Sequence, residues 1–312
     1  MVRNIIWIGV VAAFVLLSGC QSGLPAPDNK IAVVFRYDDV SCLSSTDMES
    51  KLIDAFRERG VRCTFAVIPG ACAGDAQGTA AEDAAPLPAA KVEMLAEAMK
   101  AGAVEVALHG YAHENGAGLT EDQERAIFHR AYDVLTRLAG RPPQGNRSPA
   151  WDLTPHTLSI IRELGLLYDS SLMSTDYTPF YCRTGDVIVP DGPVRFGSPT
   201  EVVELPVSWS LDDYPHFEYL RGVLPGFRAA DQVYNNWYDD VLYMLRDFDN
   251  GVVVVTFHPQ AIGRGHRLLG LERWLDRLAD LPITYARLDT VAAAFKAGTP
   301  YGVYDPERGS HR

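Results

Sequence analysis

The chain alternates short apolar, β-branched stretches with stretches of helical hydrophobic spacing, and this alternation limits its fold more than any other feature. Strand-like segments occur at residues 30–37 ("KIAVVFRY"), 61–70, 104–110 and 251–259 ("GVVVVTFHP"). A segment with apolar residues at helical spacing follows each of them. Repeated strand–helix units of this size predict a single α/β domain, a parallel (β/α) barrel of roughly seven or eight strands.

Capping sequences predict where two of the helices begin. Thr46 and Glu49 have the spacing of a capping box, and so do Thr120 and Gln123. An Ala-rich segment of low complexity, residues 73–90, separates the second strand from the next helix and is expected to form a surface loop.

The N-terminus reads as a targeting segment rather than as part of the fold. Arg3 precedes an apolar run that is too short to span a membrane comfortably, and the run ends in "LSGC" at residues 17–20. This ending resembles a bacterial lipoprotein signal, which implies cleavage before Cys20 and lipidation of that cysteine. An ordinary secretory signal is the alternative.

These features predict four segments and a location. The segments are a signal peptide at 1–19, a tether at 20–30, a folded α/β domain at 31–297 and a C-terminal tail at 298–312. The protein is expected in the cell envelope, attached to a membrane only through its lipid and facing the periplasm or the exterior. Because Gln rather than Asp follows Cys20, the outer membrane is expected if the host is Gram-negative.

Net charge makes two classes of partner unfavourable, and cysteine spacing argues against one kind of metal site. The formal net charge is -12, which makes nucleic acid and anionic surfaces poor partners but leaves an uncharged glycan acceptable. Without a CxxC pair, a cysteine zinc site is not expected.

Cys42 and Cys72 follow the first two predicted strands, whose loops lie side by side in a parallel sheet. We therefore predict a Cys42–Cys72 disulfide with Cys63 free in the core.

Polar side chains follow the predicted strands at their carboxyl ends, where parallel barrels gather their chemistry. These residues are Asp38, Asp39, His109, His113, Arg147, Asp212, Asp213 and His258. If the strands are parallel, all of them converge on one rim.

Two of these histidines have the spacing of metal ligands. His109 and His113 are four residues apart, but "HGYAH" lacks the glutamate of a zinc-protease helix. Asp39 is the natural third ligand, and two imidazoles with one carboxylate leave positions open for water and substrate, as in catalytic zinc sites. A polar turn in which the paired aspartates cap backbone amides is the alternative for Asp38 and Asp39.

Four motifs in this order resemble those of the polysaccharide deacetylases, metal-dependent carbohydrate esterases with a distorted parallel (β/α) barrel. They are "FRYDDVS" at 35–41, "HGYAH" at 109–113, "RSPAW" at 147–151 and "VTFHP" at 255–259. Val40 departs from the usual glycine after the paired aspartates. The segments "LPVSWSLDDYP" and "HPQAIGRGHR" are similar to the branch that contains peptidoglycan deacetylases and allantoinase-like enzymes.

The resemblance implies a role for each motif residue. Asp39, His109 and His113 hold one divalent metal, with zinc favoured over cobalt, nickel or manganese. Asp38 is the general base and pairs with Arg147. His258 protonates the leaving amine.

Further residues are assigned from their positions beside the motifs. Asp213 or Asp212 is expected to orient His258, with a solvated loop carboxylate as the alternative. The expected contacts to substrate are Tyr111, Pro149, Trp151 and Trp209, because aromatic faces stack on sugar rings, although aromatic residues are more often simply packed.

The leading functional hypothesis is a metal-dependent hydrolase that removes N-acetyl groups from an envelope or extracellular polysaccharide. An allantoinase-like cyclic-amide hydrolase is the first alternative, and the lipoprotein signal argues against it. A carbohydrate-binding lipoprotein without catalytic activity is the second, but such a protein needs neither Asp38 nor His258.

Overall fold

The computed structural model describes residues 31–70, 87–173, 177–187, 189, 191–263 and 265–301. Its strands are β1 (Ile31–Val40), β2 (Cys63–Val67), β3 (Val104–Leu108), β4 (Gly145–Asn146), β5 (Tyr168–Asp169), β6 (Phe180–Thr184), β7 (Ser198–Glu204), β8 (Gly251–Phe257) and β9 (Ile283–Ala286). Its α-helices are α1 (Thr46–Arg57), α2 (Ala89–Lys100), α3 (Glu121–Ala139), α4 (Thr157–Glu163), α5 (Asp213–Phe217), α6 (Ala230–Asp247), α7 (Pro259–Ile262), α8 (Gly265–Leu278) and α9 (Leu288–Ala297). Short 3-10 helices lie at Pro149–Trp151 and Trp209–Leu211.

The strands form one curled and mostly parallel sheet in the order β6-β7-β5-β4-β3-β2-β1-β8. All neighbours along this path are parallel except β6 and β7. β8 pairs with residues 31–37 of β1, β9 pairs with residues 31–34, and β2 pairs with residues 35–40. One edge of β1 is occupied by β8. The other edge is shared by β9 and β2, which makes the barrel irregular. The predicted distorted parallel barrel in a single domain is confirmed.

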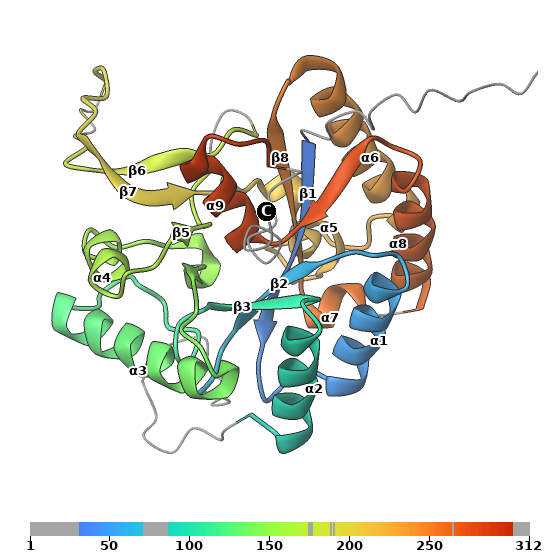
Figure 1. Ribbon diagram of the computed structural model, residues 1–312, viewed down its shortest axis with the longest axis horizontal. Coiled ribbons are helices and arrows are strands. Elements are labelled where there is room, and N and C mark those ends of the chain that lie inside the picture. The colour runs from blue at the N-terminus through green and yellow to red at the C-terminus, as the bar shows by residue number, and fades with distance from the viewer. Residues whose placement is uncertain are drawn as a thin grey trace, which may run out of the picture.

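Alternate residues of the central strands pack on two different layers. Phe35 on β1 stacks on Phe56 of α1 and meets Trp274 of α8 edge-on, with ring centroids 5.2 and 5.6 Å away. Val34, on the opposite face of the strand, packs in a second cluster that contains Val291 of α9. Helices α1, α2 and α8 therefore cover the outer face of the sheet (Figure 1), while α9 packs against its inner face.

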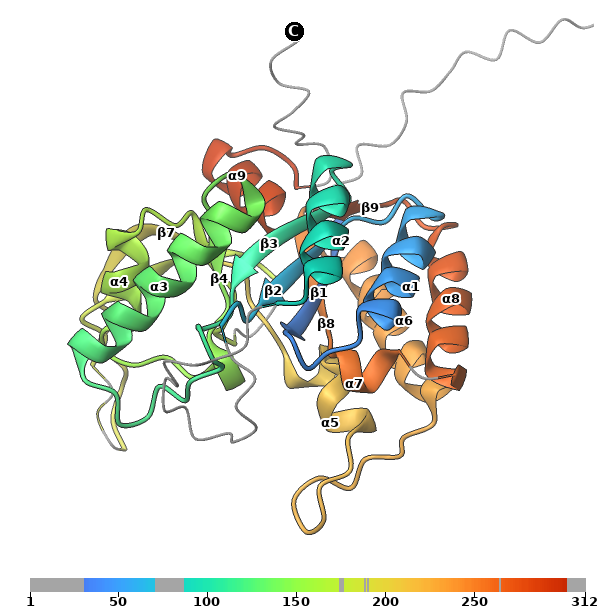
Figure 2. The ribbon, with the colours of Figure 1, turned by 90° about the horizontal axis from the view of Figure 1, so that it is seen from below.

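The carboxyl ends of β1 and β8 point toward one end of the molecule, where α5 and α7 lie (Figure 2). This end carries the residues that the sequence places at strand termini. The connection between α5 and α6 projects beyond it. The topology therefore gathers polar side chains from distant parts of the chain at one rim.

Local capping is largely as predicted. Thr120 and Gln123 form the expected capping box at the start of α3. Helix α1 begins one residue away from the prediction, because the Ser45 side chain accepts the hydrogen bond from the Met48 amide and is therefore the N-cap. Helix α2 begins at Ala89, so the last two residues of the predicted loop at 73–90 are helical, and residues 73–86 lie outside the described residues.

The predicted signal peptide, the tether and most of the C-terminal tail lie outside the described residues. Within the segments that the structure does describe, no helix has both the length and the apolar character needed to cross a membrane.

Candidate active site

Asp38 and Asp39 end β1, and an irregularity in the strand brings both side chains to the same cavity. Neighbouring residues of a regular strand point to opposite faces of the sheet. Here the pairing with β2 shifts register between Tyr37 and Val40, and Asp39 has a φ of 61°, in the left-handed region. Strained backbone of this kind is characteristic of functional sites. Both aspartates consequently line one cavity of about 250 Å³.

Asp39, His109 and His113 form a compact group of ligand atoms. Asp39 Oδ1 lies 3.1 Å from His109 Nε2 and 3.3 Å from His113 Nε2. His109 follows β3 directly, and a turn at Gly110, where φ is 67°, returns the chain so that His113 faces the same point. The predicted ligand set is thus brought together by a strand end and the turn after it.

The hydrogen bonding of His109 shows that this group suits a cation. Its Nδ1 lies 2.8 Å from the carbonyl oxygen of Arg147, which can only accept, so Nδ1 carries the proton. Burial lowers the pKa of His109, although Asp39 opposes the shift, and the ring is therefore neutral. Its Nε2 lone pair then faces the Asp39 carboxylate with no proton between them. Two opposed acceptors are stabilised by a positive ion, and a ring nitrogen fixed by a carbonyl on its far side is the usual arrangement of a metal-binding histidine.

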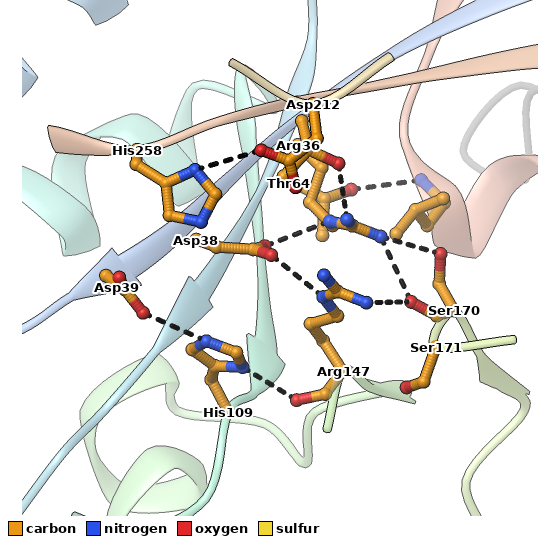
Figure 3. A network of polar contacts seen from close by, with 12 residues as sticks. Arg36, Asp38, Asp39, Thr64, His109, Arg147, Ser170, Ser171, Asp212 and His258 are labelled. Carbon is orange, nitrogen blue, oxygen red and sulfur yellow. Dashed lines mark hydrogen bonds and ion pairs between the residues drawn. The ribbon is translucent and has the colours of Figure 1, made fainter. Parts of the chain in front are cut away.

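Asp38 is enclosed by two arginines (Figure 3). Arg147 Nε donates to Asp38 Oδ2 at 2.8 Å, as expected from the sequence, and Arg36 Nε lies 2.9 Å from Asp38 Oδ1. Burial favours the neutral acid, but Arg36 and then Arg147 outweigh it and hold the pKa of Asp38 well below its usual range. Asp38 is therefore ionised throughout the physiological pH range.

Arg36 was not among the residues singled out from the sequence. The available signal was a charged residue inside the apolar run "IAVVFRY", where a buried arginine needs a compensating partner. In the structure its side chain is fully buried.

His258, directly after β8, is oriented by buried carboxylates from the start of α5. Its Nδ1 lies 2.8 Å from Asp213 Oδ1 and 3.5 Å from Asp212 Oδ1, and its backbone amide donates to Asp213 Oδ2 at 3.1 Å. Burial alone lowers the pKa of His258, but the two carboxylates outweigh it and raise that pKa to about 10. Both aspartates are buried, so neither is a solvated loop carboxylate.

Two of the four predicted substrate contacts line the 250 Å³ cavity and two do not. The rings of Trp151 and Trp209 stack with centroids 3.8 Å apart at the cavity wall. Tyr111 instead packs on Gly70 with Arg130 over its ring, because the turn after β3 directs its side chain inward. Pro149 is also buried away from the cavity, where it packs beside Gly110.

The structure adds one aromatic residue to this cavity. Tyr214 lines it, and the centroid of its ring lies 5.3 Å from that of His258. Its position two residues after Asp212, in the segment "SLDDYP", was the only sequence signal for it.

The cysteines agree with the prediction as far as they are described. Cys63 and Cys182 are free and buried, and Cys42 is disulfide-bonded. Cys72 lies outside the described residues, so the Cys42–Cys72 pairing stays a prediction. A Cys72–Cys182 bond is excluded because Cys182 is free.

Comparison with known proteins places this site in a family. A family model described as polysaccharide deacetylase matches residues 26–168, which include Asp38, Asp39, His109, His113 and Arg147. The chain is 30% identical over 206 residues to the peptidoglycan deacetylase of Helicobacter pylori, which covers 61% of this chain and 70% of that protein. The chain belongs to the polysaccharide deacetylase family.

Solved structures support the family fold. A Mycobacterium smegmatis structure assigned as a polysaccharide deacetylase has 27% identity and a TM-score of 0.63, with 90% of this chain and 96% of that chain covered. The PuuE allantoinase is 21% identical with a TM-score of 0.63, over 93% of this chain and all of that one, and at this identity it supports the fold alone. The family model ends before Asp213 and His258, so the assignment of these two residues rests on the geometry described above.

Proposed function

We propose that this protein is a metal-dependent hydrolase that removes N-acetyl groups from an envelope polysaccharide. The observation that carries the proposal is that a ligand set suited to a divalent cation, an ionised carboxylate and a protonated histidine line one cavity. Each of the three assists amide hydrolysis, because an amide carbonyl is a poor electrophile and an amide nitrogen is a poor leaving group.

Asp39, His109 and His113 hold the metal in this proposal. When bound, the ion polarises the amide carbonyl and lowers the pKa of a water molecule. Two imidazoles and one carboxylate are a donor set that suits zinc, while cobalt, nickel and manganese accept the same ligands.

Asp38 takes the proton of the attacking water. Its Oδ2 is occupied by Arg147, and its Oδ1 is buried without a directed hydrogen bond among the described residues, although Arg36 Nε is 2.9 Å away. Each carboxylate oxygen has two lone pairs, so an oxygen that contacts an arginine can still accept a proton. The two ion pairs keep the carboxylate charged and fix its direction, and they also lower its basicity.

His258 donates a proton to the leaving amine. Its Nδ1 proton is held by Asp213, so in the protonated ring Nε2 carries the second proton. Because its pKa is about 10, the ring is protonated at neutral pH and acts as the general acid from the start of the reaction. Trp151 and Trp209 contact the sugar at the wall of the cavity.

The relatives and the N-terminus support the proposed polysaccharide and the proposed location. The name of the Helicobacter pylori relative favours peptidoglycan as the substrate class. The sequence "LSGC" supports a signal peptide at residues 1–19, lipidation at Cys20 and a tether that ends before the catalytic domain at residues 31–297. An enzyme held at the membrane surface in this way meets envelope glycans rather than intracellular cyclic amides.

Acetate release from N-acetylated glycans tests this function. Purified protein is assayed on peptidoglycan fragments and chitin oligomers as isolated, after chelation, and after addition of zinc, cobalt, nickel or manganese. We expect release that chelation abolishes and a divalent metal restores. Hydrolysis of allantoin without acetate release would favour the allantoinase-like alternative, and glycan binding without any hydrolysis would favour the carbohydrate-binding alternative.

A further inference from the structure

Arg36 lies beside Arg147, and the two arginines contact different oxygens of the Asp38 carboxylate. It belongs to β1, two residues before Asp38, so the two side chains project from the same face of the strand. The Arg36 side chain has an exposed fraction of 0%, and that of Asp38 is 1%. Each oxygen of the Asp38 carboxylate therefore has its own arginine, Arg36 at Oδ1 and Arg147 at Oδ2 (Figure 3).

The Arg36 guanidinium is itself fixed by groups far away in the sequence. Its Nη1 donates to the carbonyl oxygen and the hydroxyl of Ser170, at 3.0 and 2.9 Å, and its Nη2 donates to the hydroxyl of Thr256. Arg147 Nη1 also donates to the Ser170 carbonyl, at 3.0 Å. Ser170 follows β5 and Thr256 lies near the end of β8, two residues before His258. Arg36 thus ties Asp38 to the ends of two other strands.

This arrangement is costly unless it serves Asp38. Two guanidinium groups lie beside each other without solvent and repel, and burial of a charge carries a large desolvation penalty. Apolar side chains that replace a whole buried ion pair often give equal or better stability, whereas removal of one partner alone destabilises the fold. What the second arginine adds is a constraint on direction, because the carboxylate cannot rotate without leaving one of its two partners.

We propose that Arg36 is a positioning residue for the hydrolytic reaction, which fixes the Asp38 carboxylate through the oxygen that Arg147 does not contact. This inference rests on the proposed function of Asp38 as the base. A base whose two oxygens each contact a fixed guanidinium is presented to the attacking water in one orientation, so the cost of orienting it is met during folding rather than during the reaction.

A double-mutant cycle tests whether Arg36 acts through Asp38. The variants Arg36→Met, Asp38→Asn and their combination are compared with wild type for kcat, KM, bound metal and thermal unfolding midpoint. We expect Arg36→Met to lower kcat by about 10²-fold through misplacement of the base, with metal content retained. In the Asp38→Asn background, the same replacement should change kcat by no more than about threefold, since residues that act as a unit are not additive.

Two further variants separate positioning from general stability. Arg36→Lys keeps the charge but loses the fork, so its kcat should lie between those of wild type and Arg36→Met. Arg287 is the matched control, because it is buried and paired with Asp289 at 3.0 Å but contacts Gly102, at the opposite end of the barrel. Arg287→Met should leave the kcat of the folded protein unchanged even where the unfolding midpoint falls.

The cycle is run on N-acetylated glycan and on 4-nitrophenyl acetate. The rate of ester hydrolysis depends on Asp38 but needs no glycan. Absence of glycan deacetylation would therefore contradict the proposed substrate, while ester hydrolysis would still measure the effect of Arg36. If Arg36→Met causes the same fold loss of kcat in the wild-type and Asp38→Asn backgrounds, the inference is overturned. Wild-type kcat in Arg36→Met on both substrates would also overturn it.

Discussion

The strongest quantitative prediction concerns Asp213, one of the two carboxylates that raise the pKa of His258. In Asp213→Asn, the side chain keeps its shape but loses the negative charge 2.8 Å from His258 Nδ1. His258 is active as an acid only when protonated, so the rate is lost as the pH rises through its pKa. Removal of a carboxylate that stabilises the charged ring lowers that pKa, and the alkaline limb of the pH–rate profile should move to lower pH.

The size of the shift follows from the contact. A hydrogen bond to a charged group is worth about 1.5–3 kcal/mol, and one pKa unit corresponds to about 1.4 kcal/mol. Asp212 remains in the variant, 3.5 Å from the same nitrogen, so the pKa of His258 should fall by about 1–2 units from its raised value of about 10. If the pKa of His258 is about 8.5 in Asp213→Asn, the protonated fraction of His258 at pH 9.5 is about eightfold lower than in wild type. At pH 7, His258 is protonated in both proteins.

The assay is kcat for acetate release from an N-acetylated glycan between pH 6 and pH 11, with bound metal measured at each end of the range. An activated phenyl ester is the substrate control, because a phenolate leaves without an acid and the variant should follow wild type on it. Asp276→Asn is the matched variant, since Asp276 pairs with Arg59 at 2.7 Å on the surface and should leave the profile unchanged. An alkaline limb at the wild-type position in Asp213→Asn would refute the assignment of His258 as the acid.

Three further predictions address the metal, the anchor and the disulfide. Asp39→Ala should lose metal and activity together, whereas Asp38→Asn should keep the metal and lose about 10²–10⁴-fold in rate. Metal content is measured beside acetate release for each variant. Metal loss in Asp38→Asn would indicate that both aspartates are ligands. Cys20→Ala should release the protein from membranes, and palmitate labelling that persists in this variant would exclude lipidation at Cys20. Peptide mapping of the unreduced protein should yield a Cys42–Cys72 peptide pair, and a different partner for Cys42 would show the pairing to be wrong.

The sequence predicted the parts of this protein that depend on neighbouring residues. Strand and helix periodicity gave the parallel barrel, because burial on one or two faces imposes a repeat that is visible in a short window. The grouping of Asp39, His109 and His113 at one rim was also predictable. His109 and His113 lie within one turn, and Asp39 ends a strand at the same rim.

Only the tertiary structure decided which groups compensate the buried charges. Arg36 reads as an anomaly in an apolar strand until Ser170 and Thr256, 134 and 220 residues further along the chain, are seen to bind its guanidinium. The assignment of Asp213 rather than Asp212 as the closer partner of His258 depended on the first turn of α5. Such choices cannot be read from sequence spacing, because a buried charge is stabilised by whichever groups the fold brings within hydrogen-bonding distance, regardless of their separation along the chain.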